Sequence, residues 1–124
     1  MNGLKNFEKM QNVKLPEIYK DMYTSEFRKL SGRDRLCLSN EDIIISSFLD
    51  INKISEIIEE YHDLLGYNII PFAETKYEDY ICFYYNELEK PSIIFWSYEL
   101  ALENPNEAIF YICNDFNEFL QKLK

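Results

Sequence analysis

Glycine and histidine are scarce in this chain. Its 124 residues include three glycines, at positions 3, 32 and 66, and one histidine, His62. Because loops that cradle phosphates need clustered glycines, no nucleotide-binding loop of that kind can be recognised. A histidine-based hydrolytic triad would have to use His62, and no nucleophile motif accompanies it. The sequence therefore favours a solvent-exposed position for His62 over a catalytic one.

Cysteine is also sparse and carries no recognisable pattern. Cys37, Cys82 and Cys113 are far apart and form no C-x-x-C pair, so a zinc site lacks its usual spacing. An odd number of cysteines without a signal peptide fits the reducing cytosol, and we expect a cytoplasmic protein whose three thiols are buried as small hydrophobes. Adjacent acids such as Glu59 and Glu60 lack a calcium-loop pattern. We expect no metal and no other cofactor.

Long apolar runs and a surplus of positive charge are both missing. The longest apolar runs, 80–85 and 108–113, have six residues each, whereas a membrane span takes about 20. The chain has 22 acidic and 13 basic residues, a formal net charge of −9, which disfavours binding to nucleic acid or to an anionic membrane. Residues 1–40 carry eight basic and five acidic side chains, net +3, and residues 41–124 carry five and seventeen, net −12. The acidic part of the chain is suited to a basic partner.

The residues that are present predict a globular α+β protein. The chain is 47% hydrophobic and 16% aromatic, which fits one domain with one core. We predict helices over 15–23, from about 52 to Gly66, and after a capping box at Asp115 and Glu118; strands are predicted over 35–39, 43–49, 67–72, 79–85, 92–98 and 108–113. Residues 1–14 are predicted to form an arm or a short helix. Adjacent runs of strands indicate a largely antiparallel or mixed sheet of about five to six strands flanked by helices.

One segment suggests a recognition surface. Residues 74–80 interleave acids with tyrosines between two predicted strands, and loops carry function more often than cores do. Trp96 lies on the next predicted strand, where it either fills the core or anchors a partner. The predicted contact set, in which acids steer and aromatic rings anchor, is Glu74, Tyr77, Glu78, Asp79, Trp96, Tyr98 and Glu99.

Several short motifs in a fixed order resemble those of the SUKH superfamily. They are Leu15-Pro16-x-x-Tyr19, Ile45-Ser46-Ser47-Phe48-Leu49, Ile70-Pro71-Phe72-Ala73, Asp79-Tyr80-Ile81-Cys82-Phe83, Pro91-Ser92-Ile93-Ile94-Phe95-Trp96 and Asp115-Phe116-x-Glu118-Phe119-Leu120. That superfamily comprises bacterial immunity proteins of polymorphic toxin systems and relatives of the fungal Smi/Knr regulators of cell-wall synthesis. The resemblance implies a single SUKH-like α+β domain over residues 1–124 that binds a protein and is not an enzyme.

Three functions are compatible with these features. The first is an immunity protein that neutralises a cognate toxin with a basic, nuclease-like domain by occluding its active site, without binding nucleic acid or membrane itself. The second is a Smi/Knr-type regulatory interaction module with no toxin partner. The third, ranked last, is an enzyme that combines His62 with Cys82 or Cys113. The sequence leaves the oligomeric state open between a monomer and a weak dimer.

Overall fold

The computed structural model describes residues 2–23, 35–38, 41–66, 68–75, 79–85 and 90–124. In chain order the elements are α1 (Asn2–Gln11), α2 (Glu17–Met22), β1 (Arg35–Leu38), β2 (Glu41–Phe48), α3 (Ile51–Glu60), α4 (His62–Leu65), β3 (Ile69–Thr75), β4 (Tyr80–Tyr84), β5 (Ser92–Trp96), α5 (Tyr98–Glu103), a 3-10 helix η2 (Pro105–Glu107), β6 (Ile109–Cys113) and α6 (Phe116–Lys122). Among the described residues, no helix is long and apolar enough to cross a membrane.

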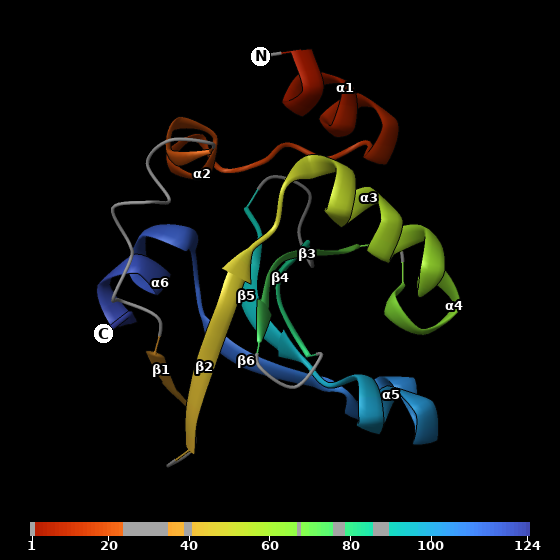
Figure 1. The fold of residues 1–124 in the computed structure, drawn as a ribbon, viewed down its shortest axis with the longest axis vertical. Helices are drawn as coiled ribbons and strands as arrows, with labels where there is room; N and C mark the ends of the chain where they lie inside the picture. The colour runs from red at the N-terminus through yellow and green to blue at the C-terminus, as the bar shows by residue number, and fades with distance from the viewer. Residues whose placement is uncertain (1, 24–34, 39–40, 67, 76–78, 86–89) are drawn as a thin grey trace.

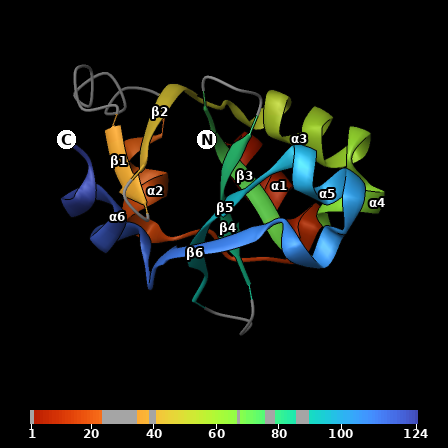
Figure 2. The same cartoon turned by 90° about the horizontal axis from the view of Figure 1, so that it is seen from below.

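Six strands form one sheet in the order in which they occur along the chain. Every neighbouring pair from β1 to β6 is antiparallel. The sheet curls, with α3, α4 and α5 toward one end of the molecule and α2 and α6 toward the other (Figures 1 and 2). Because β3, β4 and β5 are largely buried on both faces, they read as continuous apolar runs in the sequence. The predicted α+β class and the largely antiparallel sheet are confirmed.

Aromatic rings fill the core between the sheet and α2 and α6. Tyr19 of α2 lies edge-on to Phe83 of β4, with ring centroids 5.1 Å apart, and Phe83 stacks on Phe72 of β3 at 4.4 Å. Phe116 and Phe119 of α6 close the same cluster. Edge-to-face and offset stacked pairs are the favoured geometries for such rings. The cluster ties the two helices to the centre of the sheet.

Side-chain caps start α3 and α6, and the cap of α6 is the one that the sequence predicts. Asp50 accepts a hydrogen bond from the Lys53 N–H at 2.8 Å and begins α3. Asp115 accepts one from the Glu118 N–H at 2.8 Å, and Glu118 accepts in return from Asn114 N–H at 3.4 Å, which confirms the predicted cap of α6.

Helix α5 differs from the prediction. The strand predicted over 92–98 ends at Trp96, and Tyr98 begins a helix instead. Ser97 is the cause, because its Oγ accepts from the Leu100 N–H at 3.3 Å and caps the new helix. Tyrosine is common in strands, so Tyr98 made the sequence pattern of a strand extend past Trp96.

Two apolar residues predicted to be buried are exposed. The spacing of apolar residues over 15–23 predicts that Ile18 shares the packed face of the helix with Leu15 and Tyr19. That face is set by Leu15 and Tyr19, and Ile18 is 42% exposed. Cys37 is exposed because Leu36 beside it points into the core and successive residues of a strand face opposite ways. The prediction of three buried thiols therefore holds for Cys82 and Cys113 and is wrong for Cys37.

Candidate functional site

The described residues of the predicted contact set lie at one end of the sheet. Glu74, near the end of β3, pairs with Tyr80 at the start of β4, and Tyr80 pairs with Trp96 at the end of β5. Asp79 directly precedes β4, while Tyr98 and Glu99 open α5. The antiparallel register and the start of α5 together gather residues that are up to 25 positions apart in the chain. Tyr77 and Glu78 lie outside the described residues and stay predictions.

Hydrogen bonds fix α5 to the β3–β4 connection. Asp79 Oδ1 accepts from the Tyr98 N–H at 3.2 Å, and the Asp79 carbonyl accepts from the Thr75 N–H at 2.9 Å. Asp79 therefore serves as a second acceptor at the start of α5, beside Ser97. Because Asp79 Oδ1 accepts the Tyr98 N–H, Asp79 positions Tyr98 and Glu99. The sequence did not predict this positioning role.

Trp96 lies in the core directly beneath this surface. Its exposed fraction is 0%, and the rings of Tyr61, Tyr80 and Tyr98 surround it with centroids 5.9, 6.0 and 6.2 Å away. Of the two roles that the sequence left open, the structure supports filling the core, so Trp96 does not reach a partner in this conformation. Tyr98 and Tyr61 are half-buried and carry the aromatic cluster toward the surface.

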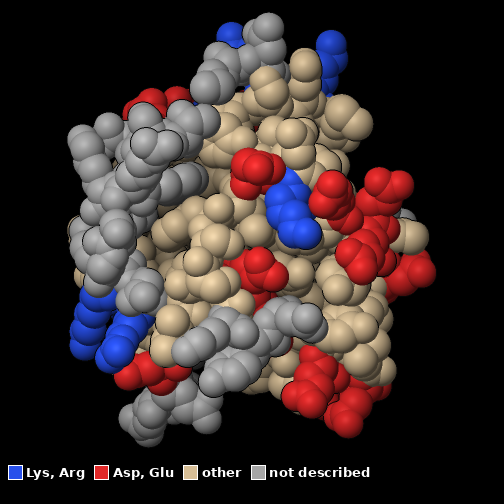
Figure 3. Space-filling model, viewed as in Figure 1, with Lys and Arg blue, Asp and Glu red and all other residues tan. Residues whose placement is uncertain are grey.

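Carboxylates gather on the helices beside this cluster. We call the exposed acids of α3, α4 and α5 the acidic face; its residues are Glu56, Glu59, Glu60, Asp63, Glu99 and Glu103. Figure 3 shows acids gathered along the side of the molecule where these helices lie. Together, residues 51–66 and 98–107 contain these six acids, Glu107 and one lysine, so their formal net charge is −6. That lysine is Lys53, whose Nζ lies 3.9 Å from Glu56 Oε2.

The acidic face was only partly foreseen. The amphipathic pattern from about residue 52 to Gly66 predicts a helix with an acidic outer face, but the predicted contact set falls within residues 74–79 and 96–99 and contains no residue of that helix. Tyr61 joins the two regions, because its ring lies 5.1 Å from that of Tyr98. The link needs α4 to pack against α5, and no local sequence signal predicts that contact.

The groups proposed for an enzyme are unsuited to nucleophilic chemistry. Burial raises the pKa of the Cys82 thiol well above its ordinary value and that of Cys113 to about 12, so both stay protonated near neutral pH. His62 is exposed, as expected, and its ring contacts the Glu59 carbonyl at 3.2 Å and the Asp63 carboxylate at 3.0 Å. Among the described residues, no group of three or more His, Cys, Asp and Glu side chains could hold a metal ion.

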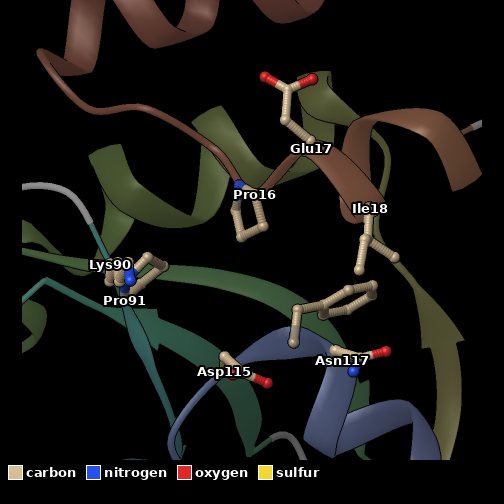
Figure 4. Close-up of a pocket in the computed structure, with 8 residues that line it drawn as sticks. Pro16, Glu17, Ile18, Lys90, Pro91, Asp115 and Asn117 are labelled. Atoms are coloured by element: carbon tan, nitrogen blue, oxygen red, sulfur yellow. The ribbon is translucent and has the colours of Figure 1, made fainter.

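A surface hollow of about 340 Å³ lies between the starts of α2 and α6 (Figure 4). Its acids already have partners, since Glu17 pairs with Lys20 at 3.1 Å and Asp115 caps α6. The Glu17 carboxylate also points away from Asp115 and Asn117. The hollow therefore lacks the converging polar groups that mark a small-molecule site.

Comparisons with known proteins give one family and one curated relative. The family model described as SMI1 / KNR4 family (SUKH-1) matches residues 2–122, so the match includes α1. The chain is similar to the SPbeta prophage-derived uncharacterized protein YokK of Bacillus subtilis (strain 168), with 34% identity over 74 residues. That alignment covers 60% of this chain and 36% of the relative, so it spans about a third of the relative's length.

Proposed function

The chain belongs to the SMI1/KNR4 family (SUKH-1), as its motifs predict, and on that premise we propose that it is an immunity protein. It binds a cognate toxin whose active site is basic, as in a nuclease, and blocks that site. The proposal takes the binding role from the family resemblance and the chemistry of the partner from the charge of this chain.

The acidic face is the observation that carries the proposal. An enzyme that cleaves nucleic acid needs a cationic groove for phosphates. The six acids of this face, with Lys53 as the one lysine on the same helices, attract such a groove at long range and compete with the substrate for it. Exposed acids of this kind mainly raise the association rate, and that effect weakens with salt.

The aromatic cluster supplies the short-range part of the proposed interface. Half-buried tyrosines make good anchors because they bury a large area with few rotatable bonds. We assign this role to Tyr98 and Tyr61, with Glu74 and Glu99 at the rim and Asp79 holding α5 in place. Trp96 takes part indirectly, as the buried ring on which both tyrosines pack.

The test is an affinity pull-down with the full chain as bait in its native cells. The bait is compared with a variant that carries Glu60→Lys and Glu99→Lys, which changes the net charge from −9 to −5. We expect the unaltered bait to recover one dominant protein with a basic domain, less of it in high salt, and the variant to recover little of it. Purified in isolation, that protein should be toxic or cleave nucleic acid, and the bait should suppress this activity.

A matched variant controls for total charge. Asp21→Lys with Asp42→Lys reverses two exposed acids on α2 and β2, away from the acidic face, and should leave recovery unchanged. Equal loss in both variants would mean that net charge, and not this surface, decides binding. Recovery of many minor partners, or of a partner without toxic activity, would replace the immunity role with a regulatory one.

A further inference from the structure

The two edge strands of the sheet, β1 and β6, differ in what their outer backbone groups bind. At the β1 edge, the Arg35 N–H donates to the Lys124 carbonyl at 3.1 Å, and the Lys124 N–H donates to the Arg35 carbonyl at 2.9 Å. At the other edge β6 pairs with β5, and within the described ranges no second strand lies beside it (Figures 1 and 2). An edge strand of this kind presents backbone N–H and C=O groups that can pair with another chain.

Two consecutive residues of β6 are exposed beside that edge, while Ile112 and Cys113 are buried. Phe110 is 41% exposed and packs on Phe95, with ring centroids 6.1 Å apart, and Tyr111 is 57% exposed. Because consecutive residues of a strand face opposite ways, β6 offers one aromatic ring on each side of the sheet. The strand contains no lysine or proline, the residues that commonly protect an edge.

The usable stretch of the edge is short. The β5–β6 register shifts between Ile93 and Ile94, which leaves Ile112 without an opposite residue and makes Ile109–Tyr111 the regular part. The whole strand has five residues and is about 17 Å long. An occupant would therefore be a short extended segment and not a second sheet.

Carboxylates stand at both ends of β6. Glu107 precedes it, and Asp115 and Glu118 follow it; two basic groups, Lys122 and Lys90, lie at the Cys113 end, and Lys90 lines the same hollow as Asp115. Partial desolvation, followed by the charges of Glu118, Cys113 and Asp115, raises the pKa of the Tyr111 hydroxyl, which fits the position of the two acids beside the strand.

We propose that β6 pairs with an extended segment of a partner protein that is apolar in its middle and carries lysine or arginine at both ends. A second copy of this chain fits poorly. In antiparallel pairing, Glu107 of each copy would lie near Asp115 of the other, and like charges beside each other destabilise a sheet. The proposal goes beyond the proposed function because it does not require the partner to be a toxin.

The test uses the full ¹⁵N-labelled chain and two blocked synthetic peptides, Lys-Thr-Val-Thr-Val-Thr-Lys and its counterpart with glutamate at both ends. We expect the lysine peptide to shift the amide resonances of residues 109–113 in a saturable, salt-sensitive way, and the glutamate peptide to bind at least about tenfold more weakly. Sedimentation of the free chain should give a monomer.

Two variants locate the effect. Phe110→Lys with Tyr111→Lys puts positive charge on both sides of the edge and should weaken binding of the lysine peptide about tenfold. Met10→Lys with Leu102→Lys alters apolar side chains that are 82% and 58% exposed elsewhere, and should bind normally. If the double β6 variant loses its folded circular dichroism spectrum, Tyr111→Lys alone replaces it. Shifts outside β6, equal binding of both peptides, no binding, or a dimer of the free chain through β6 would each overturn the proposal.

Discussion

The two acceptors at the start of α5 allow a sharp test of how this helix is held. Asp79→Ala removes the oxygen that accepts from the Tyr98 N–H, and Ser97→Ala removes the one that accepts from the Leu100 N–H. An N-cap of this kind contributes about 1 kcal/mol, so each variant should lose about that much and the double variant about 2 kcal/mol. For a chain of this length, 1 kcal/mol lowers the melting temperature by about 4 °C.

The assay is urea unfolding followed by far-ultraviolet circular dichroism. Glu103→Ala, an exposed change at the other end of the same helix, is the control and should stay within about 0.5 kcal/mol of the unaltered chain. Asp79→Asn keeps a side-chain oxygen and should retain most of the stability. If Asp79→Ala and Ser97→Ala cost no more than Glu103→Ala, the two oxygens do not hold α5, and the positioning role given to Asp79 is wrong.

The remaining predictions concern the core, the thiols and the histidine. Phe83→Ala should cost about 3–5 kcal/mol because the ring is fully buried among other rings, whereas Phe110→Ala at the exposed edge should cost less than about 1 kcal/mol in the same urea assay. A thiol-specific disulfide reagent at pH 8 should modify Cys37 rapidly and the two buried cysteines only after unfolding; rapid reaction of all three would contradict the burial described. Burial raises the pKa of Cys113 from 9 to about 12 in the folded chain, so the thiol loses its proton at lower pH in the unfolded chain than in the folded one. The free energy of unfolding should therefore fall as the pH rises from 9 to 12, and it should fall less in the Cys113→Ala variant. His62→Ala should change neither stability, beyond about 0.5 kcal/mol, nor recovery of the partner; loss of recovery with stability intact would place His62 in the interface.

Local patterns predicted most elements because the residues that begin and end them are nearby in the chain. Asp115 and Glu118 mark the start of α6, and Gly66 ends α4 with a φ of 89°, a left-handed conformation that glycine adopts easily. Ser97 was a cap signal of the same kind, but β-forming residues on either side masked it.

Contacts between distant residues were harder to foresee. Whether Trp96 lies in the core or at the surface depends on α3, α4 and α5 covering that end of the sheet. The exposure of Cys37 depends on which face of β1 the core covers, and the residues of a four-residue strand do not reveal that by themselves. The acidic face depends in the same way on two helices, more than thirty residues apart, meeting in space.

The position of Trp96 gives this protein an internal optical reporter. It is the single tryptophan of the chain, and three tyrosine rings lie within 6.2 Å of it. Light absorbed by those tyrosines should therefore be emitted largely by the indole, at the short wavelengths of an apolar environment. Because Tyr98 and Tyr61 belong both to this cluster and to the proposed interface, a partner that moves them should alter the transfer of energy while the indole stays buried. Unfolding would instead shift the indole emission itself to longer wavelengths, so one fluorescence experiment can separate binding at α5 from loss of the fold.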